Sequence, residues 1–228
     1  MSLISVLDRH NKYWFPRYPE GMRTAYIGMG ANLASWAGVP EATLAAAALR
    51  LESLGQVARR SSLYSTAPVG FAAQPRFVNA VVALETELKP RELLKGMLAI
   101  EIEFGRDRAA GVVNGPRTLD LDILIFGDLE ISEPGLEIPH PRMAERAFVL
   151  APLCDIAAEV VVPGCGKTVH ELIDSLKKAK AGPSTSLPHP SDEDLSLGTP
   201  VRSAQDDSVF GSSTDAVVRI ESAAWLSR

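Results

Sequence analysis

The stretch GPRTLDLDILIFGD, residues 115–128, has the pattern of a buried β-strand, yet it carries two aspartates. Successive strand residues point to opposite faces, which predicts a core face and a polar face. The core face is expected to hold Leu119, Leu121, Ile123 and Ile125, and the other face Thr118, Asp120, Asp122 and Leu124. Aspartate is disfavoured in strands, so the pair indicates a functional site. Spacing alone leaves four interpretations open: an arginine partner, a shared proton, a hard divalent cation, or two solvated acids beside Arg117.

Working outward from this strand, the sequence alternates between strand and helix patterns. Strands are predicted at 23–30, 57–69, 77–88 and 117–127, and helices at 40–55 and 90–105. Each of these helices has proline first and glycine last. The order β-α-β-β-α-β predicts an α+β fold, the ferredoxin-like sandwich, with a mainly antiparallel sheet and helices packed on it. A further helix is expected over 168–180.

Composition divides the chain into three parts. With 228 residues and 46% hydrophobic side chains, it can build one domain with a sizeable core, which we place at 23–180. Residues 1–22 are an N-terminal extension, and 181–228, rich in Ser, Pro, Asp and Gly, are predicted to be a mostly disordered tail. The last part of this tail, AVVRIESAAWLSR, regains the apolar character of a short docked element. No apolar run is long enough for a membrane segment, and no signal peptide is expected.

Charge and cysteine content exclude some classes of protein. The net charge is −5, but the tail holds seven acidic and three basic residues, which leaves 21 and 20 in the rest. A nearly neutral domain argues against a nucleic-acid binder, although a local basic cluster can still bind a phosphorylated small molecule. Cys154 and Cys165 lack metal-ligand spacing and are expected to be ordinary thiols in the reducing cytoplasm.

Two glycine motifs fail as phosphate-binding loops. GMGANL follows the first strand, but the third glycine of a dinucleotide-binding motif would have to replace Leu33. GCGKT, residues 164–168, lacks the leading glycine of a phosphate loop, because Val161 stands there. We therefore place the chemistry at the aspartates.

The residues just before the two aspartates point to phosphoryl transfer. GRDRAAGVVNGPR supplies Arg106, Arg108 and Arg117 among small residues that permit motion. Carboxylates that hold Mg²⁺ near mobile arginines suit ATP, because the metal bridges phosphate oxygens and arginine neutralises developing charge. The combination favours a nucleoside triphosphate site.

From about residue 24 to 173, the sequence resembles the 6-hydroxymethyl-7,8-dihydropterin pyrophosphokinase family. The resemblance rests on AYIGMGANL, APVGFAAQPRFVNAVVALET, GPRTLDLDIL and IPHPRMAERAFVLAPL, which occur in the family's order. It implies transfer of pyrophosphate from ATP to the hydroxymethyl group of the pterin, with release of AMP, in folate biosynthesis. Just before GPR the family commonly has a basic residue and then an aromatic or Asn; this chain has Val113 and Asn114 there, so it departs at Val113.

The resemblance also implies site residues. Asp120 and Asp122 would bind two Mg²⁺ ions, and Arg106, Arg108 and Arg117 would contact phosphates, with Arg106, Arg117 and the two aspartates forming the catalytic set. The remaining ATP contacts would be Glu101, Ile123, His140 and Arg146. The pterin contacts would be Asn32, Pro68, Val69, Phe77, Asn79 and Phe148.

Two other functions stay open at this point. A palm-like nucleotidyl transferase or cyclase also runs two-metal chemistry on a ferredoxin-like sheet, but it releases pyrophosphate instead of AMP. A regulatory ligand-binding domain would turn over no ATP. We expect small-molecule partners only, with neither nucleic acid nor membrane, and a monomer, although no sequence feature specifies the oligomeric state.

Overall fold

The computed structural model describes residues 21–68, 73–107, 115–181, 208–210 and 217–226. Its strands are β1 (Arg23–Ala31), β2 (Gln56–Arg60), β3 (Leu63–Thr66), β4 (Phe77–Thr86), β5 (Asp120–Phe126), β6 (Ile131–Glu133), β7 (Leu136–Ile138), β8 (Ser208–Phe210) and β9 (Val217–Ile220). Its helices are α1 (Pro40–Leu51), α2 (Pro90–Glu103), a 3₁₀ turn (Met143–Glu145), α3 (Ala147–Ala157), α4 (Val169–Ala181) and α5 (Ala223–Leu226).

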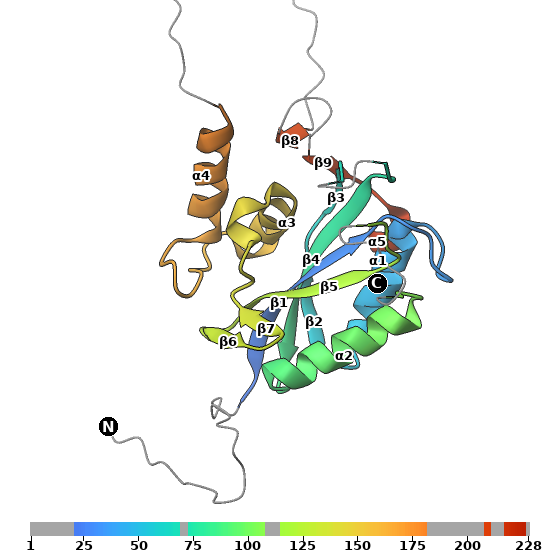
Figure 1. Cartoon of the computed structure of the whole chain (residues 1–228), viewed down its shortest axis with the longest axis horizontal. Coiled ribbons are helices and arrows are strands. Elements are labelled where there is room, and N and C mark those ends of the chain that lie inside the picture. Colours follow the sequence, from blue (N-terminus) through green and yellow to red (C-terminus); the bar gives the residue numbers. More distant parts are fainter. Residues whose placement is uncertain (1–20, 69–72, 108–114, 182–207, 211–216, 227–228) are drawn as a thin grey trace, which may run out of the picture.

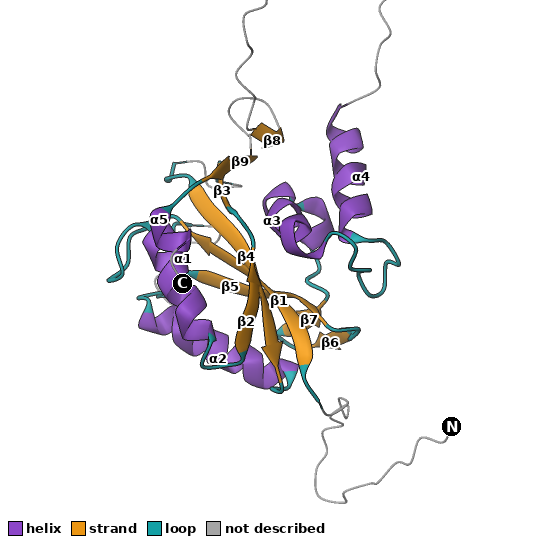
Figure 2. Cartoon of the chain, turned by 180° about the vertical axis from the view of Figure 1, so that it is seen from behind, coloured by secondary structure: helices purple, strands orange, loops and turns teal. Residues whose placement is uncertain are grey.

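One antiparallel sheet of seven strands organises the molecule. Its order is β5-β1-β4-β3-β9-β8, and β2 pairs with β4 alongside β3, while β6 and β7 form a separate hairpin. Figures 1 and 2 show α1 and α2 on one face of the sheet and α3 and α4 on the other. The predicted α+β sandwich is confirmed, together with all three predicted helices.

The predicted strand at 57–69 is wrong in one respect, because it is two short strands instead of one. Ser61 interrupts it: the Val81 N–H donates to Ser61 Oγ at 2.9 Å, and Ser61 Oγ donates to the Ser62 carbonyl at 2.7 Å. A side-chain oxygen thus replaces a main-chain partner in the ladder, and the edge turns. Hydroxyl side chains that compete with main-chain pairing are a common cause of such breaks.

Two hydrophobic cores lie on the two faces of the sheet. Ile27 and Leu121 pack under α1 and α2, whereas Val81 and Leu150 pack under α3 and α4. Ile125, predicted to share a face with Leu121, belongs to the second core instead.

A β-bulge explains this correction. Tyr26 lies opposite Ile125 while Ile27 lies opposite Ile123, which leaves Leu124 as an extra residue in β5. One extra residue ends the strict alternation beyond Ile123. Upstream of the bulge the predicted faces hold.

The C-terminal segment 217–226 is part of the main sheet and of the packing around it. β9 pairs with β3, and α5 packs beside α1, as Figure 2 shows. The predicted domain limits stay predictions, since residues 1–20 and most of the tail lie outside the described ranges. Among the helices that the structure describes, none has both the length and the apolar character that crossing a membrane requires.

Candidate active site

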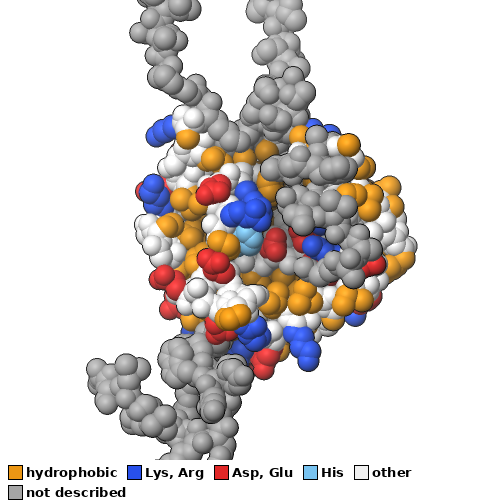
Figure 3. Space-filling model, in the orientation of Figure 1, with side chains coloured by type: hydrophobic (Ala, Val, Ile, Leu, Met, Phe, Trp, Pro, Cys, Tyr) orange, Lys and Arg blue, Asp and Glu red, His pale blue; other side chains and the backbone are white. Residues whose placement is uncertain are grey.

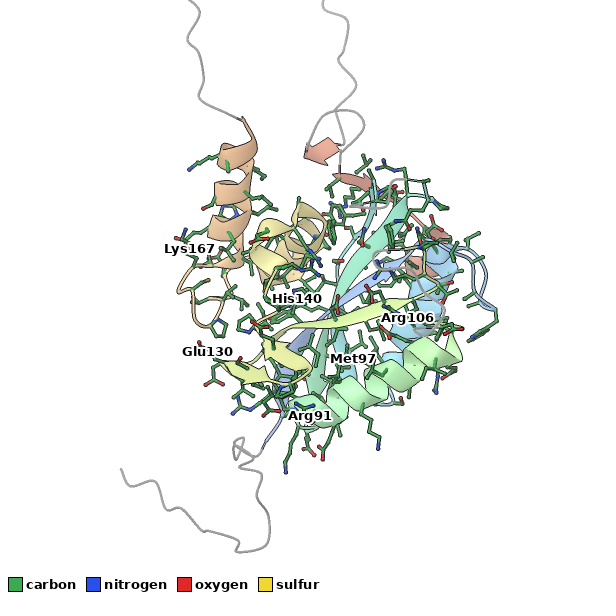
Figure 4. All side chains as sticks on the ribbon, in the orientation of Figure 1. Arg91, Met97, Arg106, Glu130, His140 and Lys167 are labelled. Carbon is green, nitrogen blue, oxygen red and sulfur yellow. The ribbon has the colours of Figure 1, made fainter. Side chains whose placement is uncertain are left out.

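A cavity of about 340 Å³ opens between the sheet and the segment that leads into α3. Its described lining consists of Gly28, Met29, Gly30, Thr66, Ala67, Phe77, Asn79, Ala80, Val81, Arg106, Arg117, Asp120, Asp122, Leu124, His140, Arg142, Arg146, Phe148 and Val149. Figure 3 shows basic, histidine and acidic side chains meeting near the middle of one face of the molecule. In Figure 4, His140 lies between the sheet and α3, and Arg106 lies just beyond the C-terminal end of α2.

The floor of the cavity is a row of residues across three adjacent strands. Gly30 of β1 lies opposite Asn79 of β4 on one side and opposite Asp120 of β5 on the other. A Cβ at Gly30 would lie 3.3 Å from Asn79 Oδ1 and 3.9 Å from the Asp120 Cβ. Gly28 occupies the same position beside Asp122. Gly30 therefore leaves the space between the Asn79 amide and the Asp120 carboxylate, two strand spacings or about 10 Å, without an intervening side chain, whereas the Leu124 side chain packs over Gly28.

Two arginines hold the carboxylate of Asp120. Arg117 Nη1 donates to Asp120 Oδ2 at 2.7 Å, and Arg106 Nη1 donates to Asp120 Oδ1. Glu101, only 1% exposed, accepts from Arg106 Nη1 at 3.2 Å and from the Leu121 N–H at 2.8 Å. Glu101 thus ties Arg106 and β5 to α2 from beneath the cavity.

Asp122 has a different electrostatic environment. Burial raises the pKa of its carboxyl above the ordinary value, and the negative charge of Asp120 raises it further. The nearby His140, Arg146 and Arg106 oppose this shift. Burial also lowers the pKa of His140, against the opposing effect of Asp122. A carboxylate that is costly to ionise in the free protein favours the approach of a cation.

The opposite end of the cavity has two aromatic rings and one amide, Asn79. Asn79, 7% exposed, donates from Nδ2 to Thr66 Oγ1 at 2.8 Å. The Arg117 guanidinium lies over the Phe77 ring, 5.3 Å from its centre. The Arg146 guanidinium likewise lies over the Phe148 ring, 5.5 Å from its centre. Two aromatic rings with a fixed amide suit a flat heterocycle with polar edges.

Asn32 connects two loops instead of lining the cavity. It is 3% exposed, and its Nδ2 donates to Gln74 Oε1 at 3.0 Å and to the Pro75 carbonyl at 3.1 Å. Its Oδ1 accepts the Arg117 N–H at 2.8 Å. Asn32 therefore sets the position of Arg117 relative to the segment before Phe77.

The structure brings most of the predicted site residues together around one cavity. Those that line it are Phe77, Asn79, Arg106, Arg117, Asp120, Asp122, His140, Arg146 and Phe148. Glu101, Ile123, Asn32 and Pro68 are absent from the described lining, and the Ile123 side chain packs in the first core. Val69 and Arg108, like Val113 and Asn114, lie outside the described residues.

Gly28, Gly30, Thr66 and Arg142 are among the lining residues that sequence reasoning missed. The glycines had a usable signal, since glycine inside a strand often marks a close approach by a ligand. Thr66 and Arg142 had none, because their positions depend on strand pairing and on the turn after His140.

The donor set fits Mg²⁺ in one specific way. Within the described ranges, no group of three His, Cys, Asp or Glu side chains could enclose a metal ion. Asp120 and Asp122 nevertheless face one cavity, and Mg²⁺ is commonly bound by one or two carboxylates together with phosphate oxygens and water. The pair therefore suits an ion that arrives with a phosphate ligand.

Comparison with known proteins decides the family. The profile described as 7,8-dihydro-6-hydroxymethylpterin-pyrophosphokinase (HPPK) matches residues 26–158. The chain belongs to this family. The resemblance stated from the sequence is thus confirmed, and with it ATP-dependent pyrophosphokinase activity in folate biosynthesis.

Named relatives agree with this assignment. The chain is 44% identical to the 2-amino-4-hydroxy-6-hydroxymethyldihydropteridine pyrophosphokinase of Pseudomonas aeruginosa over 67% of its own length and 91% of the relative's. It is 40% identical to the enzyme of the same name from Synechocystis sp., over 70% and 79% of the two chains. The Bacillus subtilis enzyme is 46% identical, over 60% and 79%.

Solved structures support the fold. Plasmodium falciparum HPPK-DHPS A437G with SDX-DHP superposes with a TM-score of 0.59 at 16% identity, over 72% of this chain and 47% of that one. The wild-type protein with SDX-DHP gives a TM-score of 0.57 at 17% identity, over 71% and 46%. The chain thus spans less than half of these two proteins.

Proposed function

We propose that a pyrophosphoryl group is transferred in this cavity from ATP to the hydroxymethyl oxygen of 6-hydroxymethyl-7,8-dihydropterin, with Mg²⁺ held by Asp120 and Asp122. The observation that carries this proposal is the row formed by Asn79, Gly30 and Asp120. In this row the Asn79 amide, which would bind a heterocycle, and the Asp120 carboxylate, which would bind a cation, are about 10 Å apart with only Gly30 between them. A bicyclic ring with a short hydroxymethyl arm fits between them.

The pterin side would use the aromatic and amide end of the cavity. Phe77 and Phe148 would flank the ring, and Asn79 would bind its amide edge through the oxygen that Thr66 leaves free. One N–H of Asn79 Nδ2 donates to Thr66 Oγ1, which orients Oδ1 over Gly30, where it can accept from a ring N–H donor. Pro68, Val69 and Asn32 stay predictions as direct contacts, and Asn32 would act by placing Arg117.

The triphosphate side would use the cations around the aspartates. Arg106, Arg117, His140 and Arg146 would contact phosphate oxygens, while Arg108, Glu101 and Ile123 stay predicted ATP contacts. Mg²⁺ bound by Asp120 and Asp122, with two ions expected, would supply charge neutralisation of the triphosphate. Arg106 and Arg117, which pair with Asp120 in the structure, lie where they can turn to the phosphates.

The reaction requires positioning more than covalent participation by the protein. The hydroxymethyl oxygen forms a bond to the β-phosphorus of ATP, the bond from that phosphorus to the α-phosphate bridging oxygen breaks, and AMP leaves. The hydroxyl proton passes to solvent. No protein nucleophile is needed, so the effect of the site is orientation and electrostatic stabilisation.

A product assay tests the proposal. Purified protein with ATP and the hydroxymethyl dihydropterin should form AMP with Mg²⁺ and not after chelation of Mg²⁺. Asp122→Ala should reduce turnover by orders of magnitude without unfolding the protein, whereas Asp174→Ala, on the exposed side of α4, should not. Pyrophosphate as product would indicate the nucleotidyl transferase or cyclase, and no turnover would favour a ligand-binding domain. The monomeric state, the cytoplasmic location and the absence of nucleic-acid or membrane partners stay predictions.

A further inference from the structure

The C-terminal segment 217–226 lies well beyond the part of the chain that matches the family, yet it is built into the sheet. β9 pairs antiparallel with β3, with Leu63 opposite Ile220 and Ser65 opposite Val218. We propose that this segment is a clamp that fixes β3 and thereby sets the affinity of the cavity for the pterin. The proposal rests on the assignment of the pterin to the Asn79 end.

The clamp is anchored in both hydrophobic cores. Val217, 4% exposed, belongs to the core under α3, whereas Trp225, 5% exposed, belongs to the core under α1. Trp225 Nε1 donates to the Ser61 carbonyl at 2.8 Å, and Arg60 lies over the Trp225 ring at 5.6 Å. The segment therefore wraps around the edge of the sheet. Burial of the large Trp225 side chain provides the hydrophobic free energy that keeps this short segment attached.

β3 is the strand that depends most on this support. It has four residues, and its inner side pairs with β4. Ser61 breaks the ladder just before it begins, so its regular continuation from β2 is lost. A short edge strand with one neighbour opens readily, and a second neighbour satisfies its outer main-chain groups.

β3 leads directly to the pterin end of the cavity. Thr66, its last residue, holds the Asn79 amide. Ser65, its third residue, accepts from Arg76 Nε at Oγ, at 3.0 Å, and from Arg76 Nη2 at the carbonyl, at 3.1 Å. Arg76 immediately precedes Phe77. Asn79 and Phe77, two of the proposed pterin contacts, thus depend on the strand that β9 covers.

The triphosphate end should be much less affected. Asp120 and Asp122 lie on β5, which is separated from β3 by β4 and β1 in the sheet. His140 and Arg146 come from the segment that leads into α3. Among the proposed phosphate contacts, Arg117 touches the pterin end, where it lies over Phe77. Loss of the clamp should therefore weaken pterin binding much more than ATP binding.

Truncation after residue 210, together with point variants, tests this selectivity. The truncated protein should show a KM and a calorimetric dissociation constant for the pterin raised about tenfold, with those for ATP within about twofold of the full chain. Trp225→Ala should act in the same direction, and the milder Trp225→Phe, which keeps a ring but loses the hydrogen bond, should have a smaller effect. Leu226→Ala is the matched control, because this neighbour on α5 is 72% exposed. Hydrogen exchange at β3 should be faster in the truncated protein.

The outcomes separate the clamp from the proposed function. Unchanged pterin binding after truncation, or equal losses for pterin and ATP, would overturn the clamp even if the full chain is active. If the full chain makes no AMP, the proposed function fails, and the clamp is then judged by hydrogen exchange at β3 and by calorimetric pterin binding. If the truncated chain does not fold, the two Trp225 variants and Leu226→Ala decide by the same two measurements.

Discussion

Asn79 of β4 donates a side-chain N–H to Thr66 Oγ1 of the neighbouring strand β3 at 2.8 Å, and this hydrogen bond fixes the orientation of the Asn79 amide. Both are nearly buried, at 7% and 4% exposure. Buried amides are fixed by such partners, because an unpaired polar group away from water is costly. The orientation of the proposed pterin-binding amide is therefore set by its hydrogen bond to Thr66 on the neighbouring strand β3.

Thr66→Val should raise the KM for the pterin about threefold to tenfold, since it removes a hydrogen bond of about 1 kcal/mol that orients Asn79. The KM for ATP should stay within a factor of two. Thr66→Ser keeps the hydroxyl and should behave like the natural protein. Steady-state kinetics with each substrate varied in turn provides the measurement, and equal effects of the two substitutions would contradict the assignment.

Glu101→Gln should lower kcat and stability more than it affects the KM for ATP. Its carboxylate holds Arg106 and the Leu121 N–H, and the neutral amide would leave the buried end of the Arg106 guanidinium less well compensated. Weakening a buried charge-assisted pair costs about 1–3 kcal/mol. Thermal unfolding and kinetics check this together. A large rise in the ATP KM with unchanged stability would instead indicate direct contact with the nucleotide, as the sequence resemblance implied.

Arg142→Ala should raise the KM for ATP about tenfold, because this arginine lines the cavity beside His140 and Arg146 and can bind phosphate oxygens. Arg142→Lys should recover part of the loss. Arg91→Ala is the matched control. Figure 4 shows this arginine at the N-terminal end of α2, away from His140, and it pairs with Glu133. An ATP KM that is the same in the Arg142 and Arg91 variants would remove Arg142 from the site.

Asp122→Asn should abolish activity and yet stabilise the metal-free protein at neutral pH. The pKa of the folded-state carboxyl is raised, so its stabilising contribution is present below the ordinary aspartate pKa and is lost as the pH rises through the folded value. The amide removes this loss, by about 1.4 kcal/mol for each unit of pKa shift.

Urea unfolding of both proteins in EDTA, from acid to neutral pH, measures the effect. The stability advantage of Asp122→Asn should grow with pH. Asp120→Asn is the contrasting variant, because it weakens ion pairs with Arg106 and Arg117 and should bring no gain. An advantage that shrinks as the pH rises would show that the Asp122 carboxylate is stabilised in the fold.

The sequence predicted the elements whose periodicity is regular. α1, α2 and α4 have one apolar face and recognisable ends, and β5 alternates up to its bulge. α3 was not predicted as a helix, because AFVLAPLCDIA is apolar on nearly every side and contains Pro152, so it lacks an amphipathic pattern. The break at Ser61 depends on a hydrogen bond to Val81, twenty residues away, which no local pattern contains.

For the site, the residues within recognisable motifs were predicted and the contacts between motifs were not. The pairing of Asp120 with Arg117, three residues away, was among the interpretations that the spacing left open. The pairing of Asp120 with Arg106, and the position of Glu101 beneath it, arise from the packing of α2 against β5. The participation of Thr66 requires the pairing of β3 with β4. Such long-range contacts depend on how the elements pack and pair, which a local strand or helix pattern does not determine.

The bulge at Leu124 gives β5 two separate registers. Before Leu124, the side chains of Asp120 and Asp122 face the cavity. After Leu124, Ile125 and Phe126 pack in opposite cores. The single extra residue works as a phase shift between the two halves. Without Leu124, Ile123 and Ile125 would be neighbours on opposite faces of a regular strand, so neither half would have to change sides. The extra residue instead adds a side chain that is 1% exposed and a carbonyl that accepts the His140 N–H at 2.9 Å. It thereby attaches the segment that carries His140 to the strand that carries the aspartates, so deletion of Leu124 should displace His140 from the cavity.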